Sequence, residues 1–300
     1  METAAVSASA LRQVQAGGLT FPVLSWGRAG ARPVLLLHGF PQEPSTWAPV
    51  AQALARDGFQ VFAPWQRGYV ASARPSWRRA YSCTQLVGDV VGIADGLGLA
   101  RFDVVGFGVA GAQAWMVAAF HKDRVRSVTS LRFPHPAALA STVRSDPEQR
   151  EKWQQLQREV GVADPAAKAA ALLAGDAAGL RRFLASGDLP QPFLDRYVTR
   201  LKEPGALAAA LSWNQAISLD EFARVPAVGV AALLVWTDGP AFAWAAVCAT
   251  RAYVHARLTE IVLPGSDHFI LERSPDALIG PLREHLGADV RSRLSGVRGR

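Results

Sequence analysis

Three glycines interrupt an apolar run near the middle of the chain, and they carry the most specific chemical signal in the sequence. The run Phe102–Gly106 is rich in β-branched residues, Gly108 and Gly111 follow it, and the residues up to Phe120 are apolar and rich in alanine. A β-branched run that stops at glycines and leads into such a segment predicts a strand, a tight turn and a helix. Two chemistries use a turn of this shape.

One chemistry is phosphate binding, in which glycines let a pyrophosphate approach a helix N-terminus. The other is a nucleophile elbow, in which a strained residue projects a nucleophile and the next backbone N–H faces the substrate. In an elbow, Gly108 takes the nucleophile position and Val109 supplies the N–H. Several predicted strands precede the glycines, whereas the dinucleotide fingerprint normally follows the first strand of its fold. Phosphate binding remains an alternative, because the guanidinium group of Arg132, at the end of the next predicted strand, could bind the 2′-phosphate of a dinucleotide.

Strands and helices alternate on both sides of this turn. Strand patterns cover 19–26, 34–37, 58–63, 102–106, 125–131, 228–236 and 258–263, and helical patterns cover 45–54, 86–97 and 276–285. Such alternation predicts an α/β fold with a mostly parallel, doubly wound sheet. Residues 137–224 have helical spacing and few β-branched residues, which indicates three or four inserted helices. We therefore expect a core formed by 1–134 and 225–300, with a helical cap at 135–224.

Composition limits the classes of partner. The 300 residues are 50% hydrophobic, which allows a large core, but no apolar stretch is long enough to span a bilayer. The net charge of +7 comes mainly from scattered arginines with no recognised nucleic-acid-binding module beside them. Cys83 and Cys248 form no disulfide framework, and no signal sequence is apparent. We expect a cytoplasmic monomer or homodimer that binds neither nucleic acid nor membranes.

Further motifs flank the glycine turn. His38-Gly39-Phe40-Pro41 follows a predicted central strand, residues 63–69 have the sequence APWQRGY, and residues 264–269 have the sequence PGSDHF before the last predicted helix. Over nearly the whole chain, these segments resemble the α/β-hydrolase superfamily, and within it the epoxide hydrolase and haloalkane dehalogenase branch. The resemblance implies the α/β-hydrolase fold with an inserted cap, an oxyanion hole at the N–H groups of Phe40 and Val109, and a catalytic histidine, His268.

The sequence departs from that family where its other catalytic residues belong. Gly108 replaces the aspartate or serine nucleophile, and Asn214 stands where a cap tyrosine would polarise an epoxide oxygen. The place of the triad acid falls near Pro240, so Asp238 reaches His268 only if the loop bends differently. A covalent ester needs an oxygen or sulfur nucleophile, which glycine cannot supply.

For His268, Asp238 and His38, the sequence allows a structural role as well as a functional one. His268 is either a general acid or base held by Asp238 or a relic histidine satisfied by Asp267 or solvent, and Asp238 precedes a glycine, as in an ordinary turn. His38 either contacts substrate or supports the oxyanion turn.

The predicted substrate-binding set also includes Arg132, Trp213, Asn214, Phe107 and Phe269. Tryptophans at such positions are as often part of the core, and Arg132 can equally lie at the surface. The remaining histidines are scattered and form no ligand set, so we expect neither a metal nor a cofactor.

A capped apolar cavity, two N–H donors and one histidine suit chemistry without a covalent intermediate. We expect a non-hydrolytic biosynthetic enzyme that cyclises, rearranges or couples an apolar, polycyclic or polyketide-like small molecule, with or without an epoxide. One alternative is an epoxide hydrolase or esterase in which His268 activates water directly. The other is a ligand-binding protein without catalysis.

Overall fold

The computed structural model describes residues 10–159, 164–185, 188–215, 218–237, 242–264 and 268–287. An eight-stranded sheet with the order β1-β2-β4-β3-β5-β6-β7-β8 forms its centre. The strands are β1 (Ala10–Ala16), β2 (Leu19–Trp26), β3 (Arg32–Leu37), β4 (Phe59–Pro64), β5 (Phe102–Phe107), β6 (Val125–Leu131), β7 (Ala231–Thr237) and β8 (Leu258–Leu263). From β4 to β8 every neighbouring pair is parallel, whereas β1–β2 and β2–β4 are antiparallel. The predicted α/β class and mostly parallel sheet are confirmed.

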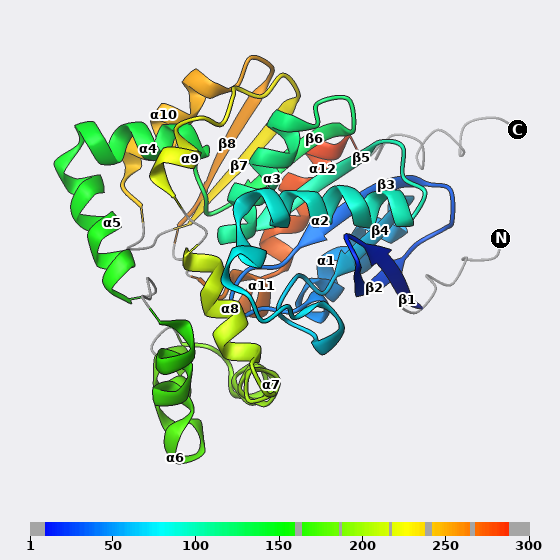
Figure 1. Cartoon of the computed structure of the whole chain (residues 1–300). Coiled ribbons are helices and arrows are strands. Elements are labelled where there is room, and N and C mark those ends of the chain that lie inside the picture. Colours follow the sequence, from blue (N-terminus) through cyan, green and yellow to red (C-terminus); the bar gives the residue numbers. More distant parts are fainter. Residues whose placement is uncertain are drawn as a thin grey trace, which may run out of the picture.

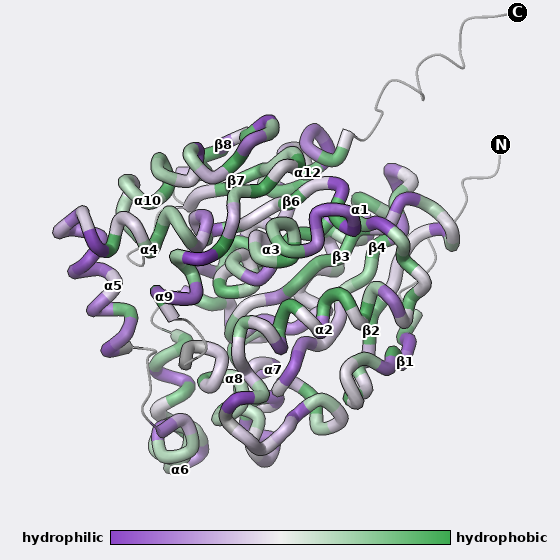
Figure 2. Tube along the Cα trace, turned by 45° about the horizontal axis from the view of Figure 1, so that its top comes forward, coloured by the Kyte–Doolittle hydropathy of each residue, from purple (hydrophilic) through white to green (hydrophobic). Residues whose placement is uncertain are grey.

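Helices cover both faces of the sheet (Figure 1). The helices outside the interval between β6 and β7 are α1 (Ala48–Arg56), α2 (Cys83–Gly96), α3 (Val109–Phe120), α10 (Trp244–Ala249), α11 (Ile270–Arg273) and α12 (Asp276–Leu286). One hydrophobic cluster joins α2 and α3 to one face of the sheet, and a second joins α1 and α12 to the other face. Central strands such as β5 and β7 are buried at nearly every position because helices cover both of their faces, and apolar residues, green in Figure 2, predominate in them.

A glycine turn joins the two strands at the antiparallel edge of the sheet. Gly17 and Gly18 connect β1 to β2 with φ angles of 55° and 77°, which side chains rarely adopt. The sequence interpretation did not include β1, in which polar residues interrupt the apolar ones and only Val14 and Ala16 are buried.

Six helical segments lie between β6 and β7 in the part of the chain that the structure describes, rather than the expected three or four. They are α4 (Pro136–Ser145), α5 (Pro147–Glu159), α6 (Pro165–Ala185), α7 (Gln191–Leu201), α8 (Ala206–Gln215) and α9 (Leu219–Phe222). Non-helical residues at 174–177 divide α6 into two helices. We call residues 136–222 the insertion. Pro136, Pro147 and Pro165 each stand at the first position of a helix, where proline is favoured. These prolines divide an alanine-rich stretch whose composition alone gives no boundaries.

A third hydrophobic cluster joins the insertion to the core. Leu194, Tyr197, Val198 and Leu201 form one buried face of α7, and they pack in a cluster that also contains Trp213 and reaches core residues. The division into separate core and cap domains stays a prediction. None of the helices that the structure describes has the length and apolarity needed to cross a bilayer.

Candidate functional site

The carboxyl ends of the parallel strands place the predicted site residues at one edge of the sheet. Leu37 of β3 leads into His38, Phe107 of β5 leads into Gly108, and Leu131 of β6 leads into Arg132. Strands that run in the same direction end on the same side, and open α/β sheets bind ligands at that edge.

The turn between β5 and α3 has the geometry of a strained elbow at Gly108. This residue has φ 58° and ψ −128°, a combination that is costly for a residue with a side chain. A Cβ on Gly106 would lie 2.0 Å from the carbonyl oxygen of Ala110, and one on Gly111 would lie 2.5 Å from Ser130 Oγ. A Cβ on Gly108 would meet nothing within 4 Å. Close packing therefore requires the two outer glycines, while the middle one faces open space.

The two predicted oxyanion donors belong to the turns that follow β3 and β5. Val109 is the first residue of α3, and the N–H groups in the first turn of a helix have no partner within the helix. Phe40 precedes Pro41 in a cis peptide, and a Cβ on Gly39 would lie 2.7 Å from the carbonyl oxygen of Phe107. The contact at Gly39 brings the two turns against each other. The assignment of Phe40 and Val109 as donors stays a prediction.

His268 lies against the oxyanion turn. Its Nε2 is 2.7 Å from the carbonyl oxygen of Phe40, and because a carbonyl can only accept, Nε2 carries the proton of this hydrogen bond. Phe107 and Phe269 hold the imidazole by edge contacts, with ring centroids 5.6 Å and 5.1 Å away. Both phenylalanines are buried. The two rings thus support His268, and their predicted contact with substrate stays a prediction.

His38 supports the oxyanion turn from inside the protein. Its Nδ1 is 3.0 Å from the carbonyl oxygen of Gly39, and its Nε2 accepts from the backbone N–H of Gln66 at 3.2 Å. The ring is fully buried, and burial lowers the pKa of His38 to about 4. A neutral, buried imidazole with partners at both nitrogens favours the structural interpretation over the predicted substrate contact.

The structure describes only some of the remaining predicted residues in full. Asp238 lies outside the described residues, and for Asn214 the structure describes only the backbone, which belongs to α8. Arg132 follows β6 in a left-handed conformation with φ 66°, and its N–H donates to the carbonyl oxygen of Val235 at 2.8 Å. Trp213 is buried, and its Nε1 donates to the carbonyl oxygen of Arg67 at 2.9 Å. Trp213 therefore fixes α8 to the core beside the elbow.

Cys83 lines the same cavity as Val109, the first residue of the elbow helix. Burial raises its pKa to about 12, and the nearby charge of Glu221 acts in the same direction. Cys83 therefore stays a protonated thiol at neutral pH, and a protonated thiol is not an activated nucleophile. Within the described ranges, no three His, Cys, Asp or Glu side chains gather where they could hold a metal ion.

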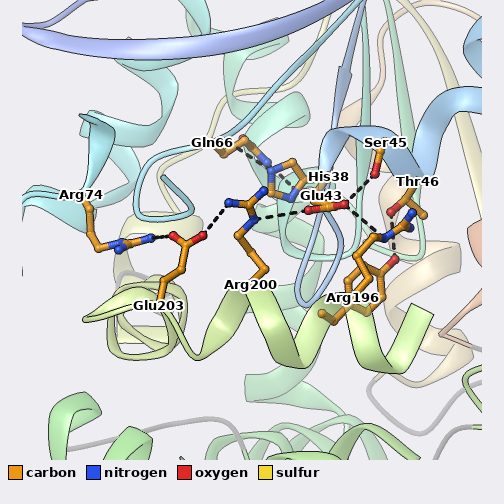
Figure 3. Close-up of polar contacts among 10 residues, drawn as sticks. His38, Glu43, Ser45, Thr46, Gln66, Arg74, Arg196, Arg200 and Glu203 are labelled. Atoms are coloured by element: carbon orange, nitrogen blue, oxygen red, sulfur yellow. Dashed lines mark hydrogen bonds and ion pairs between the residues drawn. The ribbon is translucent and has the colours of Figure 1, made fainter. Parts of the chain in front are cut away.

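Polar contacts fasten α7 of the insertion to the core loop after the oxyanion turn (Figure 3). Glu43 in this loop pairs with Arg196 at 3.1 Å and with Arg200 at 3.6 Å. Nearby, Arg74 pairs with Glu203 at 3.2 Å. Glu43 is buried, whereas the side chains of Arg196 and Arg200 are 38% and 35% exposed, so water reaches these ion pairs from the arginine side.

A buried carboxyl group connects the histidine segment to the same loop and to α7. Glu272 Oε1 accepts from the Tyr197 hydroxyl at 2.6 Å and from Gln42 Nε2 at 3.0 Å. The Tyr197 hydroxyl also lies 2.8 Å from Thr46 Oγ1. Sequence analysis did not identify this network, since its members come from segments far apart in the chain. The available sequence signal for this network was a glutamate four residues after His268.

Replacing Glu272 by glutamine is expected to make the protein less sensitive to pH. Burial is the main cause that raises the pKa of Glu272 from 4.5 to about 6, and it outweighs the hydrogen bonds from Tyr197 and Gln42 and the charge of Arg196. The folded state therefore binds more protons than the unfolded state between these values. The stability of the wild type falls as pH rises through this window, by about 2 kcal/mol. Urea unfolding at pH 4 and pH 7 measures the difference between the two proteins.

The expected gain of Glu272→Gln relative to the wild type is larger at pH 7 than at pH 4. Tyr197→Phe is the companion variant, because it removes a hydrogen bond that favours the ionised carboxylate, and it should extend the pH-dependent loss to higher pH. An equal difference between Glu272→Gln and the wild type at both pH values would contradict the prediction.

Comparison with known proteins relates this geometry to a family. The family model described as alpha/beta hydrolase fold matches residues 32–275. Epoxide hydrolase A of Mycobacterium tuberculosis is 33% identical over 219 residues, which cover 68% of this chain and 66% of that protein. AB hydrolase superfamily protein YfhM of Bacillus subtilis is 29% identical over 217 residues, which cover 71% of this chain and 75% of that protein.

A solved structure of similar length has the same fold. It is described as one of the novel epoxide hydrolases of the alpha/beta hydrolases superfamily from metagenomes of hot environments. It superimposes with a TM-score of 0.80 at 27% identity, covering 93% of this chain and 99% of that one. The matched span includes the glycine turn, the insertion and His268. The predicted resemblance is confirmed at the level of the fold family, which favours the elbow over a phosphate-binding turn. The chain belongs to the α/β-hydrolase fold family.

Proposed function

We propose that this protein opens epoxides of apolar small molecules with water, without a covalent enzyme intermediate. The observation that carries the proposal is the elbow at Gly108, which has open space above it and no side chain to attack a substrate. We infer that Gly108 stands where related enzymes carry the nucleophile. The similarity to epoxide hydrolases supports the choice of substrate class.

His268 provides the proton transfer in this proposal. Its Nε2 proton points at the carbonyl oxygen of Phe40, beside the N–H groups of Phe40 and Val109 that would hold the epoxide oxygen. The oxygen of a water molecule attacks one epoxide carbon while the ring C–O bond breaks. Nδ1, the basic nitrogen of the neutral imidazole, takes a proton from the attacking water, and the ring oxygen takes the proton of Nε2. The product is a diol, and proton exchange with solvent returns His268 to its starting tautomer.

Two kinds of group stabilise the charge that develops in this reaction. Backbone N–H donors that are already in position cost no reorganisation when negative charge appears on the ring oxygen, and each is worth about 3 kcal/mol. Proton transfer by a positioned histidine adds roughly 10²-fold to 10⁴-fold. The partly buried aromatic side chains of Phe40 and Trp65, which pack on the hydrophobic cluster of the insertion, suit an apolar substrate.

A second candidate function is favoured by the same open space. A hydroxyl group or carbon nucleophile of the substrate itself can take the place of water above Gly108. Attack within one molecule then gives a cyclic ether or a new carbon–carbon bond, with the same proton transfer at His268. This is the biosynthetic cyclisation that the sequence suggested, and it differs from the first candidate only in the identity of the attacking atom.

Incubation in water labelled with oxygen-18 distinguishes the two candidates. A panel of aryl and alkyl epoxides, half of which carry an internal hydroxyl group, is expected to give diols with one labelled oxygen. Mass spectrometry measures the label, and boiled protein corrects for spontaneous opening. Unlabelled cyclic products that depend on the protein would support the second candidate. If the protein gives no more product than the boiled control, both candidate functions are overturned and a ligand-binding protein remains.

A further inference from the structure

The carboxyl group of Glu272 joins three parts of the candidate site. Its Oε1 accepts from the Tyr197 hydroxyl of α7 at 2.6 Å and from Gln42 Nε2 at 3.0 Å. Gln42 is fully buried shortly after Phe40, and a Cβ on Gly39 would lie 3.5 Å from its Oε1, so it packs against the oxyanion turn. Glu272 therefore connects its own helix, α11, to that turn and to the insertion.

Helix α11 directly follows the histidine segment. It has only four residues, and Phe269 is its N-cap residue. The N–H groups of Glu272 and Arg273 donate to the carbonyl oxygen of Phe269 at 3.1 Å and 2.9 Å. The Phe269 ring lies against His268, with ring centroids 5.1 Å apart. Because four residues form little more than one helical turn, a displacement of Glu272 also displaces the imidazole of His268.

One oxygen of the Glu272 carboxyl group has no donor. Among the residues that the structure describes, none donates to Glu272 Oε2, and none donates to Oε1 of the neighbouring Gln42. Both atoms are shielded from solvent. A buried charged oxygen without a partner is costly, whereas a protonated carboxyl group is neutral and is itself a donor. Burial accordingly raises the pKa of Glu272 from 4.5 to about 6.

The groups that face this carboxyl group come from α7 and from the loop after the oxyanion turn. The Tyr197 hydroxyl stays protonated, because burial raises its pKa far above the ordinary value, and the amide of Gln42 is neutral. The charge of Arg196 and the hydrogen bonds from Tyr197 and Gln42 favour the ionised carboxylate, but desolvation outweighs them. Ionisation of Glu272 therefore weakens the closed arrangement relative to one that water can enter.

We propose that Glu272 is a positioning residue for His268, and that its carboxyl group holds the histidine segment against the oxyanion turn and α7. This role rests on the proposed function of His268. The neutral carboxyl group holds the three parts together, and its ionisation lets them separate. Glu272 takes no part in the proton transfer itself and acts through the position of α11. The site is therefore held more tightly in mildly acidic solution than above neutral pH.

Hydrogen exchange measured by mass spectrometry tests this connection without any substrate. The wild type is compared with Glu272→Gln, which keeps an acceptor for Tyr197 and cannot ionise. In a peptide that covers α11, the ratio of the wild-type exchange rate to that of the variant is expected to rise roughly eightfold from pH 5 to pH 7.5. This is the change in local opening that a pKa of 4.5 in the open state and about 6 in the closed state implies. A peptide from β1 is the internal reference, and its ratio should stay constant.

Glu43→Gln is the matched control. Glu43 is another buried glutamate that fastens the same loop to α7, through Arg196 and Arg200. This variant should keep the pH dependence of the wild type in the α11 peptide. Tyr197→Phe removes a donor that favours ionisation, so the rise in exchange should begin at higher pH than in the wild type. The tyrosine variant also tests the proposal if Glu272→Gln does not fold.

Activity gives a second readout. With an epoxide substrate, kcat/KM of the wild type relative to Glu272→Gln should fall by up to about eightfold from pH 5 to pH 7.5. An exchange ratio in α11 that does not change with pH, or epoxide turnover whose ratio stays constant, would overturn the positioning role. If neither protein opens epoxides, the ring-opening function is overturned, and hydrogen exchange still decides whether Glu272 holds the three parts together. The two failures therefore give separate results.

Discussion

Replacing Gly108 by aspartate is expected to create a covalent intermediate with epoxides and to raise turnover roughly tenfold or more, a change in barrier of about 1.4 kcal/mol. A Cβ at this position meets nothing within 4 Å, and a carboxylate there lies at the N-terminus of α3, where negative charge is favourable. The new oxygen attacks an epoxide carbon, the ring C–O bond breaks, and the ring oxygen takes a proton from His268. Hydrolysis of the ester by water then releases the diol.

Intact-protein mass spectrometry detects the ester as an added mass of one substrate. The matched control is Gly108→Asn, which has the same shape and the same backbone strain but no carboxylate, and it should form no adduct. Gly111→Asp should instead fail to fold stably, since its Cβ would lie 2.5 Å from Ser130 Oγ and 2.8 Å from Phe133 Cβ. Equal turnover and no adduct in both Gly108 variants would show that this residue does not occupy the nucleophile position.

Replacing His268 by alanine is expected to lower kcat/KM about 10²-fold to 10⁴-fold, the range for loss of a positioned general acid or base. The structure already places Nε2 of His268 2.7 Å from the carbonyl oxygen of Phe40. A ligand oxygen held at the neighbouring N–H groups can therefore receive the Nε2 proton after a small movement. Steady-state kinetics on the best epoxide of the panel measures the loss.

A second variant separates proton transfer from support of the oxyanion turn. His268→Gln can still donate a hydrogen bond to Phe40, but an amide does not transfer protons near neutral pH. It should lose activity like the alanine variant while keeping the thermal stability of the wild type. His255→Ala is the control, since His255 is exposed, and it should leave kcat/KM unchanged. Activity of His268→Ala within threefold of the wild type would argue against the proposed mechanism.

The sequence allowed prediction of the elements that form the edge of the site. The parallel strands contain runs of apolar and β-branched residues, and glycines mark turns that residues with a side chain rarely form. These local signals located β3, β5, β6 and β8 and the elbow at Gly108. They did not locate β1, and they gave too few helices for the insertion, where an alanine-rich stretch hides the helix boundaries. The prolines at the helix starts were the signal that the interpretation did not use.

The sequence by itself determined the fold family, the strand–turn–helix at residues 102–120 and the absence of a nucleophilic side chain at Gly108, because each depends on residue types at short spacing. Only the tertiary structure showed that His268 donates to Phe40 and that Glu272 joins Tyr197 to Gln42. Each of these features joins segments that are distant in the chain. The hydrogen-bonding and burial of a polar side chain depend on which segments pack around it, and local spacing does not encode that packing.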